Sequence, residues 1–199
     1  MRPWMRVVVV VLLLSTSAAS GGTDLPHPDE LKRLEAGEPV VRTRMAFNAS
    51  GGRAGEGRAY IVIDRPPDVV WRFAQDYERF VQSIPRLKKV VVLERALERL
   101  RVFHLVGLGL RSLRYTLDVT FHPSERMVSW QLDKSRPNDI HDTTGTWRFI
   151  PHGPGRTLAV YTISLDTGFP LPPFLEDYIT TRDLPQMLRA VKRGAESLD

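Results

Sequence analysis

The sequence predicts an α+β fold in which a curved antiparallel sheet of about seven strands wraps around one long C-terminal helix. Three observations predict this fold. A strand-like run over residues 58–64 precedes a pair of short helical segments, about six further strand-like runs follow, and an amphipathic segment closes the chain. A sheet that wraps around one helix leaves a cavity between the two, and such cavities hold apolar small molecules. The order of elements therefore predicts a ligand-binding module.

The first twenty residues have the three-part pattern of a secretory signal peptide. Arg2 and Arg6 give a positive start, residues 7–14 form an unbroken apolar run, and small residues follow over 15–21. The apolar run is shorter than the roughly 20 residues that a membrane-spanning helix needs, so an uncleaved anchor is the weaker alternative. We expect residues 1–20 to be a cleaved signal peptide and the mature protein to be secreted or periplasmic.

Composition narrows the classes of function. The chain of 199 residues has no cysteine, so an exported form would be held together by its core, without disulfide bonds. The formal net charge of +5 is spread along the chain rather than gathered in a basic stripe, which argues against nucleic-acid binding. Arginine is used more often than lysine, as in GC-rich bacterial genomes. We expect a bacterial monomer that binds no nucleic acid.

Residues 21–54 form an N-terminal extension to the ligand-binding domain, which we place at 55–199. In the extension we expect a short helix over 29–36 and an extended strand over 39–47. Four glycines between residues 50 and 57 predict a flexible loop after them.

Two short helices are expected between the first strand of the domain and the next. Pro66, Pro67 and Asp68 begin this part, apolar residues then recur at helical spacing, and Pro85 ends it.

Six strands are predicted in the centre of the chain, over residues 87–97, 98–108, 113–121, 127–134, 142–150 and 157–167. The third alternates cleanly, with Tyr115, Leu117 and Val119 on one face and Thr116 and Asp118 on the other, as a half-buried strand does. A Gly- and Pro-containing turn joins the last two as a hairpin.

The C-terminal segment begins with a proline-rich stretch over 169–174, and a short helix is expected over 174–181. Asp183 is expected to cap the last helix, with Pro185 in its first turn, where the missing N–H costs little. The apolar stripe of this helix must bury against the sheet, which is the only partner large enough.

This order of elements resembles the helix-grip fold, and more narrowly the START/polyketide cyclase/coenzyme Q-binding (Bet v1-like, SRPBCC) superfamily. The residues that carry the resemblance are 59–71, 76–80, 84–85, 138–140 and 145–149. The resemblance covers residues 55–198 and implies a deep apolar cavity between the sheet and the last helix. Members of the superfamily bind sterols, phospholipids, quinones, polyketides or plant hormones. Some are cyclases or hydrolases and many have no chemistry, so the fold does not decide the function.

Large apolar and aromatic side chains of the predicted strands and last helices are the candidates for lining this cavity. They are Tyr115, Leu117, Val119, Trp130, Trp147, Phe149, Tyr161, Ile163, Phe174, Tyr178 and Met187, with His104 as a polar anchor. Tyr and Trp combine an apolar body with a polar tip, which suits an amphipathic ligand. The alternative for each of them is a place in a closed core.

No catalytic residue, metal site or cofactor is predicted. His141 and Asp142 are neighbours on a strand, so their side chains point to opposite faces and cannot act as an acid–base pair. Asp118 and Arg148 are expected on the outer, solvent-facing side of the sheet. No two histidines have metal-ligand spacing on a helix, and a cysteine nucleophile is absent.

Three functions remain open. The leading hypothesis is an exported carrier or sensor for a lipid, fatty acid or quinone-like molecule, with gates over 108–113 and 169–174 and a transient membrane contact through Leu108 and Leu110. The second is a cyclase/dehydrase- or hydrolase-type enzyme, with His104, Asp118, Asp142 and Tyr115 as scattered candidates. The third is an interaction protein whose cavity is closed.

Overall fold

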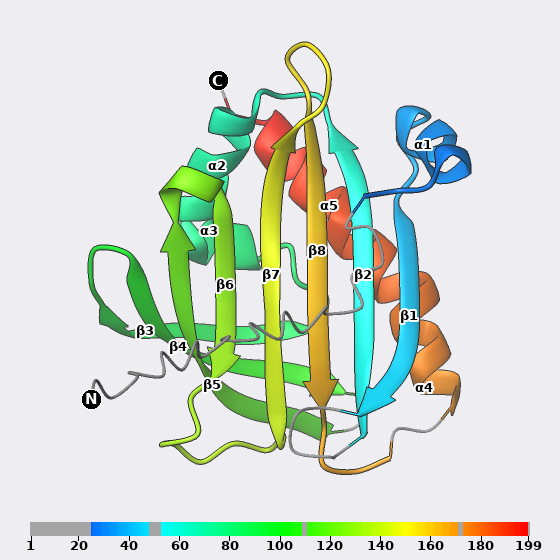
Figure 1. Ribbon diagram of the computed structural model, residues 1–199. Helices are drawn as coiled ribbons and strands as arrows, with labels where there is room; N and C mark the ends of the chain where they lie inside the picture. The colour runs from blue at the N-terminus through cyan, green and yellow to red at the C-terminus, as the bar shows by residue number, and fades with distance from the viewer. Residues whose placement is uncertain (1–24, 48–52, 109–110, 171–172, 199) are drawn as a thin grey trace, which may run out of the picture.

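The computed structural model describes residues 25–47, 53–108, 111–170 and 173–198, and it confirms the predicted fold class (Figure 1). One antiparallel sheet of eight strands, in the order β1-β2-β8-β7-β6-β5-β4-β3, curves around the C-terminal helix α5. No helix of these residues is long and apolar enough to cross a membrane.

The strands are β1 (Val40–Phe47), β2 (Arg53–Ile63), β3 (Leu87–Arg95), β4 (Arg99–Leu108), β5 (Arg111–His122), β6 (Met127–Leu132), β7 (Asp142–Pro151) and β8 (Thr157–Asp166). The helices are α1 (Pro28–Glu35), α2 (Pro67–Gln75), α3 (Tyr77–Val81), α4 (Pro173–Tyr178) and α5 (Leu184–Glu196), with a 3-10 turn at Pro123–Glu125 and a π-helical turn at Ile179–Asp183. Each predicted helix and strand is present, with boundaries that differ by a few residues.

The main core lies between the inner face of the sheet and the helices α2, α3 and α5. On β5 the predicted alternation is confirmed, because Leu117, Val119 and Phe121 belong to this core while Asp118 pairs with Arg101 on the outer face. The stripe of α5 is buried against the sheet as predicted, through Met187, Leu188, Val191 and Ala195.

A lysine and a glycine of α5 fix how the helix lies on its neighbours. The Lys192 ammonium lies 2.6 Å from the Asp64 carboxylate and donates to the Val62 carbonyl at 3.0 Å, both at the end of β2. A Cβ at Gly194 would lie 2.3 Å from the Phe73 ring, so only glycine lets α2 and α5 approach this closely.

The N-terminal extension is part of the sheet and supplies its eighth strand. β1 pairs with β2 along its whole length, and the expected boundary at residue 55 falls inside β2. The flexible loop expected over residues 50–57 is wrong from Arg53 onward, because Gly55 and Gly57 pair with β1 and β8 on either side. The helix α1 packs on the outer face of the sheet, on the side opposite α5 (Figure 1). It closes a second, smaller core made by Leu34, Val40, Tyr60, Val62, Leu158 and Val160.

The expected cap at the start of α5 is wrong. The Asp183 side chain makes no capping hydrogen bond, because the residue has helical dihedrals and continues a π-helical turn directly into α5. Pro185 lies in the first turn of α5 as predicted. Because proline has no N–H, one backbone hydrogen bond of the helix is missing next to the wider π-helical turn. The Asp183 carboxylate, which makes no cap, pairs with Arg86.

Candidate ligand-binding site

A cavity of about 230 Å³ lies between the inner face of the sheet, the helix α3 and the start of α5. Its walls are mainly apolar and aromatic. Strands β4 to β8 contribute their inward residues, and the loops after α3, β6 and β8 complete the lining at one end. The lining includes Phe80, Val81, Ile84, Leu113, Leu117, Trp130, Ile140, Trp147, Tyr161, Ile163 and Met187.

Stacked aromatic rings form the wall on β6, β7 and β8. The rings of Trp130 and Tyr161 stack with centroids 5.7 Å apart, and Trp147 lies 4.7 Å from Tyr161. Gly145 is paired with Trp130 across the strands, and a Cβ there would lie 2.1 Å from the indole. The missing side chain at Gly145 therefore allows Trp130 to lie flat over β7 and face the cavity.

One buried part of the lining is polar. His104 on β4 is 1% exposed, and its ring lies between those of Tyr115, at 5.4 Å, and Tyr77, at 6.3 Å. Burial lowers the pKa of His104 to about 4, so the imidazole is neutral at physiological pH. Burial also raises the pKa of Tyr115 to about 12 and that of Tyr161, so both phenols stay protonated.

An ion pair closes the end of the cavity formed by the loops. Arg86, in the loop after α3, lies 2.9 Å from the Asp183 carboxylate, and its guanidinium stacks 4.7 Å from the centre of the Tyr178 ring. Burial raises the pKa of Asp183, and the neighbouring Arg86 opposes that rise. Arg86 has a φ of 63°, and its carbonyl accepts a hydrogen bond from the Gly107 N–H at 2.9 Å. The contacts of Arg86 thus join the loop after α3 and the end of β4 to the π-helical turn.

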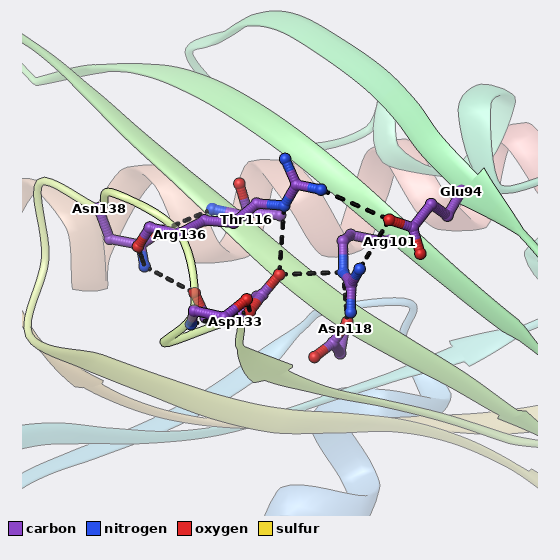
Figure 2. A network of polar contacts seen from close by, with 8 residues as sticks. Glu94, Arg101, Thr116, Asp118, Asp133, Arg136 and Asn138 are labelled. Atoms are coloured by element: carbon purple, nitrogen blue, oxygen red, sulfur yellow. Dashed lines mark hydrogen bonds and ion pairs between the residues drawn. The ribbon is translucent and has the colours of Figure 1, made fainter.

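The connection from β6 to β7 brings Ile140 into the cavity wall, and a polar network on the outer face holds this connection (Figure 2). Asn138 accepts a hydrogen bond from the Thr116 N–H and donates to the Asp133 carbonyl, at 2.8 and 2.9 Å. The buried Asp133 carboxylate lies 2.9 Å from Arg101, whose guanidinium also pairs with Glu94 and Asp118. The connection thereby continues the pairing of β5 beyond the end of β6.

The structure brings most of the predicted lining residues to the cavity. Tyr115, Leu117, Trp130, Trp147, Tyr161, Ile163, Met187 and His104 all line it. Val119 and Phe149, each 1% exposed, lie instead in the closed core, because they sit further along their strands than the cavity reaches. Tyr178 is 45% exposed and covers Arg86 from outside, and the side chain of Phe174 lies outside the described residues. Whether the lining residues bind a ligand remains a prediction.

The other titratable candidates lie away from the cavity. Asp118 faces outward, Asp142 pairs with Lys134 at 2.9 Å, and His141 packs against Gly168. His152 pairs with Glu35 of α1 on the outer face. Within the described ranges, no group of three or more His, Asp or Glu side chains is placed to hold a metal ion. Leu110, expected at a membrane contact, lies outside the described residues.

The prediction from sequence missed the lining residues of α3 and of the loops, and also some strand residues such as Leu113 and Val128. Tyr77, Phe80, Val81 and Ile84 recur at helical spacing and were expected only to form a helix. Because α3 is short, its apolar face covers the sheet only in part and borders the cavity. Ile140 carries no such signal, since its place depends on side-chain contacts made by its neighbours.

The sequence matches the family described as polyketide cyclase/dehydrase and lipid transport over residues 63–192. Among solved structures, the Zhui aromatase/cyclase from Streptomyces sp. R1128 is similar, with 19% identity and a TM-score of 0.61, covering 72% of this chain and 94% of its own. A STAR-related lipid transfer protein from Xanthomonas axonopodis has 14% identity and a TM-score of 0.59, covering 78% of this chain and 99% of its own.

Human StAR-related lipid transfer protein 5 has 11% identity and a TM-score of 0.60, covering 80% of this chain and 82% of its own. At these identities the likeness shows the fold alone. No curated protein matches the sequence. The family match extends from the end of β2 to α5 and so spans the elements that enclose the cavity. The chain therefore belongs to the polyketide cyclase/dehydrase and lipid transport family, a fold that suggests binding of a hydrophobic ligand.

Proposed function

We propose that this protein binds a small apolar molecule between the sheet and α5, and that it carries or senses this molecule outside the cytoplasm. The observation that carries the proposal is the cavity of about 230 Å³ beside the main core, between the sheet and the helices. Protein interiors are close-packed, so a hollow of this size with apolar walls is typical of a binding site. An interaction protein would need no such hollow.

The size of the cavity limits the ligand. A water-sized group takes about 30 Å³ in a liquid, so a cavity of about 230 Å³ holds on the order of eight non-hydrogen atoms. A single-ring quinone or a short acyl chain is of this size. A sterol or phospholipid would fit only if the loops around Arg86 and Asp183 moved apart.

The binding free energy comes mainly from removing the ligand from water. Each Å² of apolar surface that becomes buried contributes about 25 cal/mol. The stacked rings of Trp130, Trp147 and Tyr161 offer a preformed wall, so little side-chain ordering opposes binding.

Native mass spectrometry of the protein purified from the periplasm of its own host, followed by lipid extraction, tests both parts of the proposal. We expect one apolar molecule per chain and a protein mass that lacks residues 1–20. A ligand-free protein from which no apolar molecule is extracted would contradict the binding function. A full-length mass would contradict cleavage of the signal peptide.

A second candidate function, catalysis on the bound molecule, is favoured by the meeting of His104 with Tyr77 and Tyr115 inside the cavity. A pKa of about 4 makes His104 a weak base at neutral pH, where a catalytic base works best with a pKa near 7. Asp183, the one carboxylate among the described lining residues, is paired with Arg86. Incubating the complex and then measuring the mass of the extracted molecule separates binding from catalysis, because binding alone leaves that mass unchanged.

A further inference from the structure

His104 is a buried polar side chain without a partner. Its Nδ1 and Nε2 atoms are both shielded from solvent, and neither has a hydrogen-bond partner within the described part of the chain. Buried polar groups in folded proteins are almost always hydrogen-bonded, and each exception calls for an explanation. A neutral imidazole has one donor and one acceptor, so His104 has two unused positions.

The neighbours of His104 are polar at their tips and also line the cavity. Tyr115 lies directly across from His104 in the register of β4 and β5, and Tyr77 approaches from α3. Tyr161 completes the group from β8. Burial and the proximity of the other phenols, without a hydrogen bond, account for the raised pKa of the Tyr77 and Tyr161 hydroxyls. Tyr115 lies deep in the molecule but is only partly buried, so its accessible surface faces the cavity.

This part of the cavity carries no net charge. Among the described residues that line it, the charged side chains are Arg86 and Asp183, which are paired with each other near the loops. The imidazole and the three phenols are all neutral near pH 7. A ligand carboxylate would lose its water here and find no free cation, whereas a neutral hydroxyl or carbonyl group would find donors and acceptors.

We propose that His104, Tyr77 and Tyr115 form a polar subsite for one neutral hydroxyl or carbonyl group on an otherwise apolar ligand. The ligand class is thus a small phenol, alcohol or ketone rather than a carboxylic acid. The Tyr115 ring lies 5.4 Å from the imidazole, and both side chains border the cavity that the ligand group would enter. The proposal deepens the proposed function and depends on it.

Three probes of similar size test the subsite by isothermal titration calorimetry at pH 7: 4-ethylphenol, ethylbenzene and benzoate. We expect 4-ethylphenol to bind about ten-fold more tightly than ethylbenzene, as one or two net hydrogen bonds would give. The more apolar ethylbenzene would bind more tightly if burial alone decided. We expect benzoate to bind most weakly, because its carboxylate would lose water without gaining a free cation.

The His104→Phe variant keeps a ring of similar shape and removes both nitrogens. We expect it to lose the ten-fold preference and to raise the melting temperature of the ligand-free protein, since two unsatisfied polar atoms disappear. His104→Gln restores a donor and an acceptor and should recover part of the preference. His122→Phe, on the outer face where His122 contacts Ser129, is the matched control and should leave the preference intact.

Imidazole ¹⁵N chemical shifts of wild type give a readout that is independent of affinity. We expect the His104 signals to move on addition of 4-ethylphenol and to stay in place with ethylbenzene, with His122 as an internal reference. Equal affinity for 4-ethylphenol and ethylbenzene, or a preference that survives His104→Phe, would overturn the subsite and leave the proposed function standing. Failure of all three probes to bind would overturn both.

Discussion

Single residues of the cavity make the stability of the fold depend on pH. The pKa of His104 falls from 6.5 to about 4 on folding, so the unfolded chain binds a proton that the folded protein excludes. The free energy of unfolding has its full contribution from neutral His104 above pH 6.5, and this contribution is lost as the pH falls toward 4. Over this window wild type should lose on the order of 3 kcal/mol more than His104→Phe.

Urea denaturation of both proteins at pH 7 and at pH 4.5 measures this difference. Comparing the two removes the contributions of Glu30, Asp133 and Asp139, whose pKa values are lowered by Arg42, Ser135 and Arg114 and which also weaken the fold in acid. If the free energy of unfolding changed with pH equally in the two proteins, His104 would take up no proton on unfolding.

A second prediction concerns the glycine below the aromatic wall. In Gly145→Ala the new Cβ would lie 2.1 Å from Trp130 and 2.4 Å from the Thr162 carbonyl, so the indole must move. We expect a loss of about 1–3 kcal/mol in the free energy of unfolding, and a shift in tryptophan emission. Gly55→Ala on β2, where the nearest atom is 3.9 Å away, is the control and should change neither. Equal effects of the two variants would argue against the close contact.

Alternation in the sequence was enough to predict some of the strand residues of the cavity wall, although Leu113 and Val128 were not among them. Alternate residues of a strand face the inside of the sheet, and those that line the cavity include Tyr115, Leu117, Trp130 and Tyr161. The alternation does not show how far along a strand the cavity extends. For this reason Val119 and Phe149 were predicted to line the cavity although they lie in the core. That extent depends on where the short helix α3 stops, which is a property of packing.

At the scale of the elements, the Arg86 contacts control the end of the cavity formed by the loops. Arg86→Gly keeps the left-handed backbone, with φ at 63°, and removes both the ion pair to Asp183 and the stacking on Tyr178. We expect faster exchange of bound 4-ethylphenol, by NMR line shape, with little change in the fold, since partly exposed ion pairs contribute about 0–1 kcal/mol. Arg126→Gly removes a surface pair with Asp68 and should leave exchange unchanged. Exchange that is equally slow in both variants would place the route to the cavity elsewhere.

The order of helices and strands was predictable because each carries its own periodicity or turn residues. The π-helical turn was not, since Asp183 followed by Pro185 is also the pattern of an ordinary helix start. The contact of Asp183 with Arg86, about a hundred residues earlier in the chain, takes the place of the cap.

The whole molecule is built on a sheet with a core on each face. Leu34 of α1 is fully buried in the outer core, on the face opposite the cavity. We expect Leu34→Ala to lower the free energy of unfolding by about 2–5 kcal/mol, and to leave the relative affinities for 4-ethylphenol and ethylbenzene unchanged. Denaturation and calorimetry on the same samples test this. Altered relative affinities would show that the two faces are coupled.

The second core was not predictable from residues 21–54 by themselves. Val40 is adjacent to Val41, and the two side chains face opposite sides of the sheet, so no clean alternation marks β1 as a strand with a buried outer face. The residues that pack with Val40, among them Leu158 and Val160, lie far away in the chain. Their sequence pattern predicted a strand but not a second core.

The outer core also bears on what happens when the ligand leaves. Strands β1, β2 and β8 are anchored from behind by contacts that involve none of the residues lining the cavity. An empty cavity would weaken packing on the inner face alone, so we expect the backbone of these three strands to keep the same shape with and without a ligand.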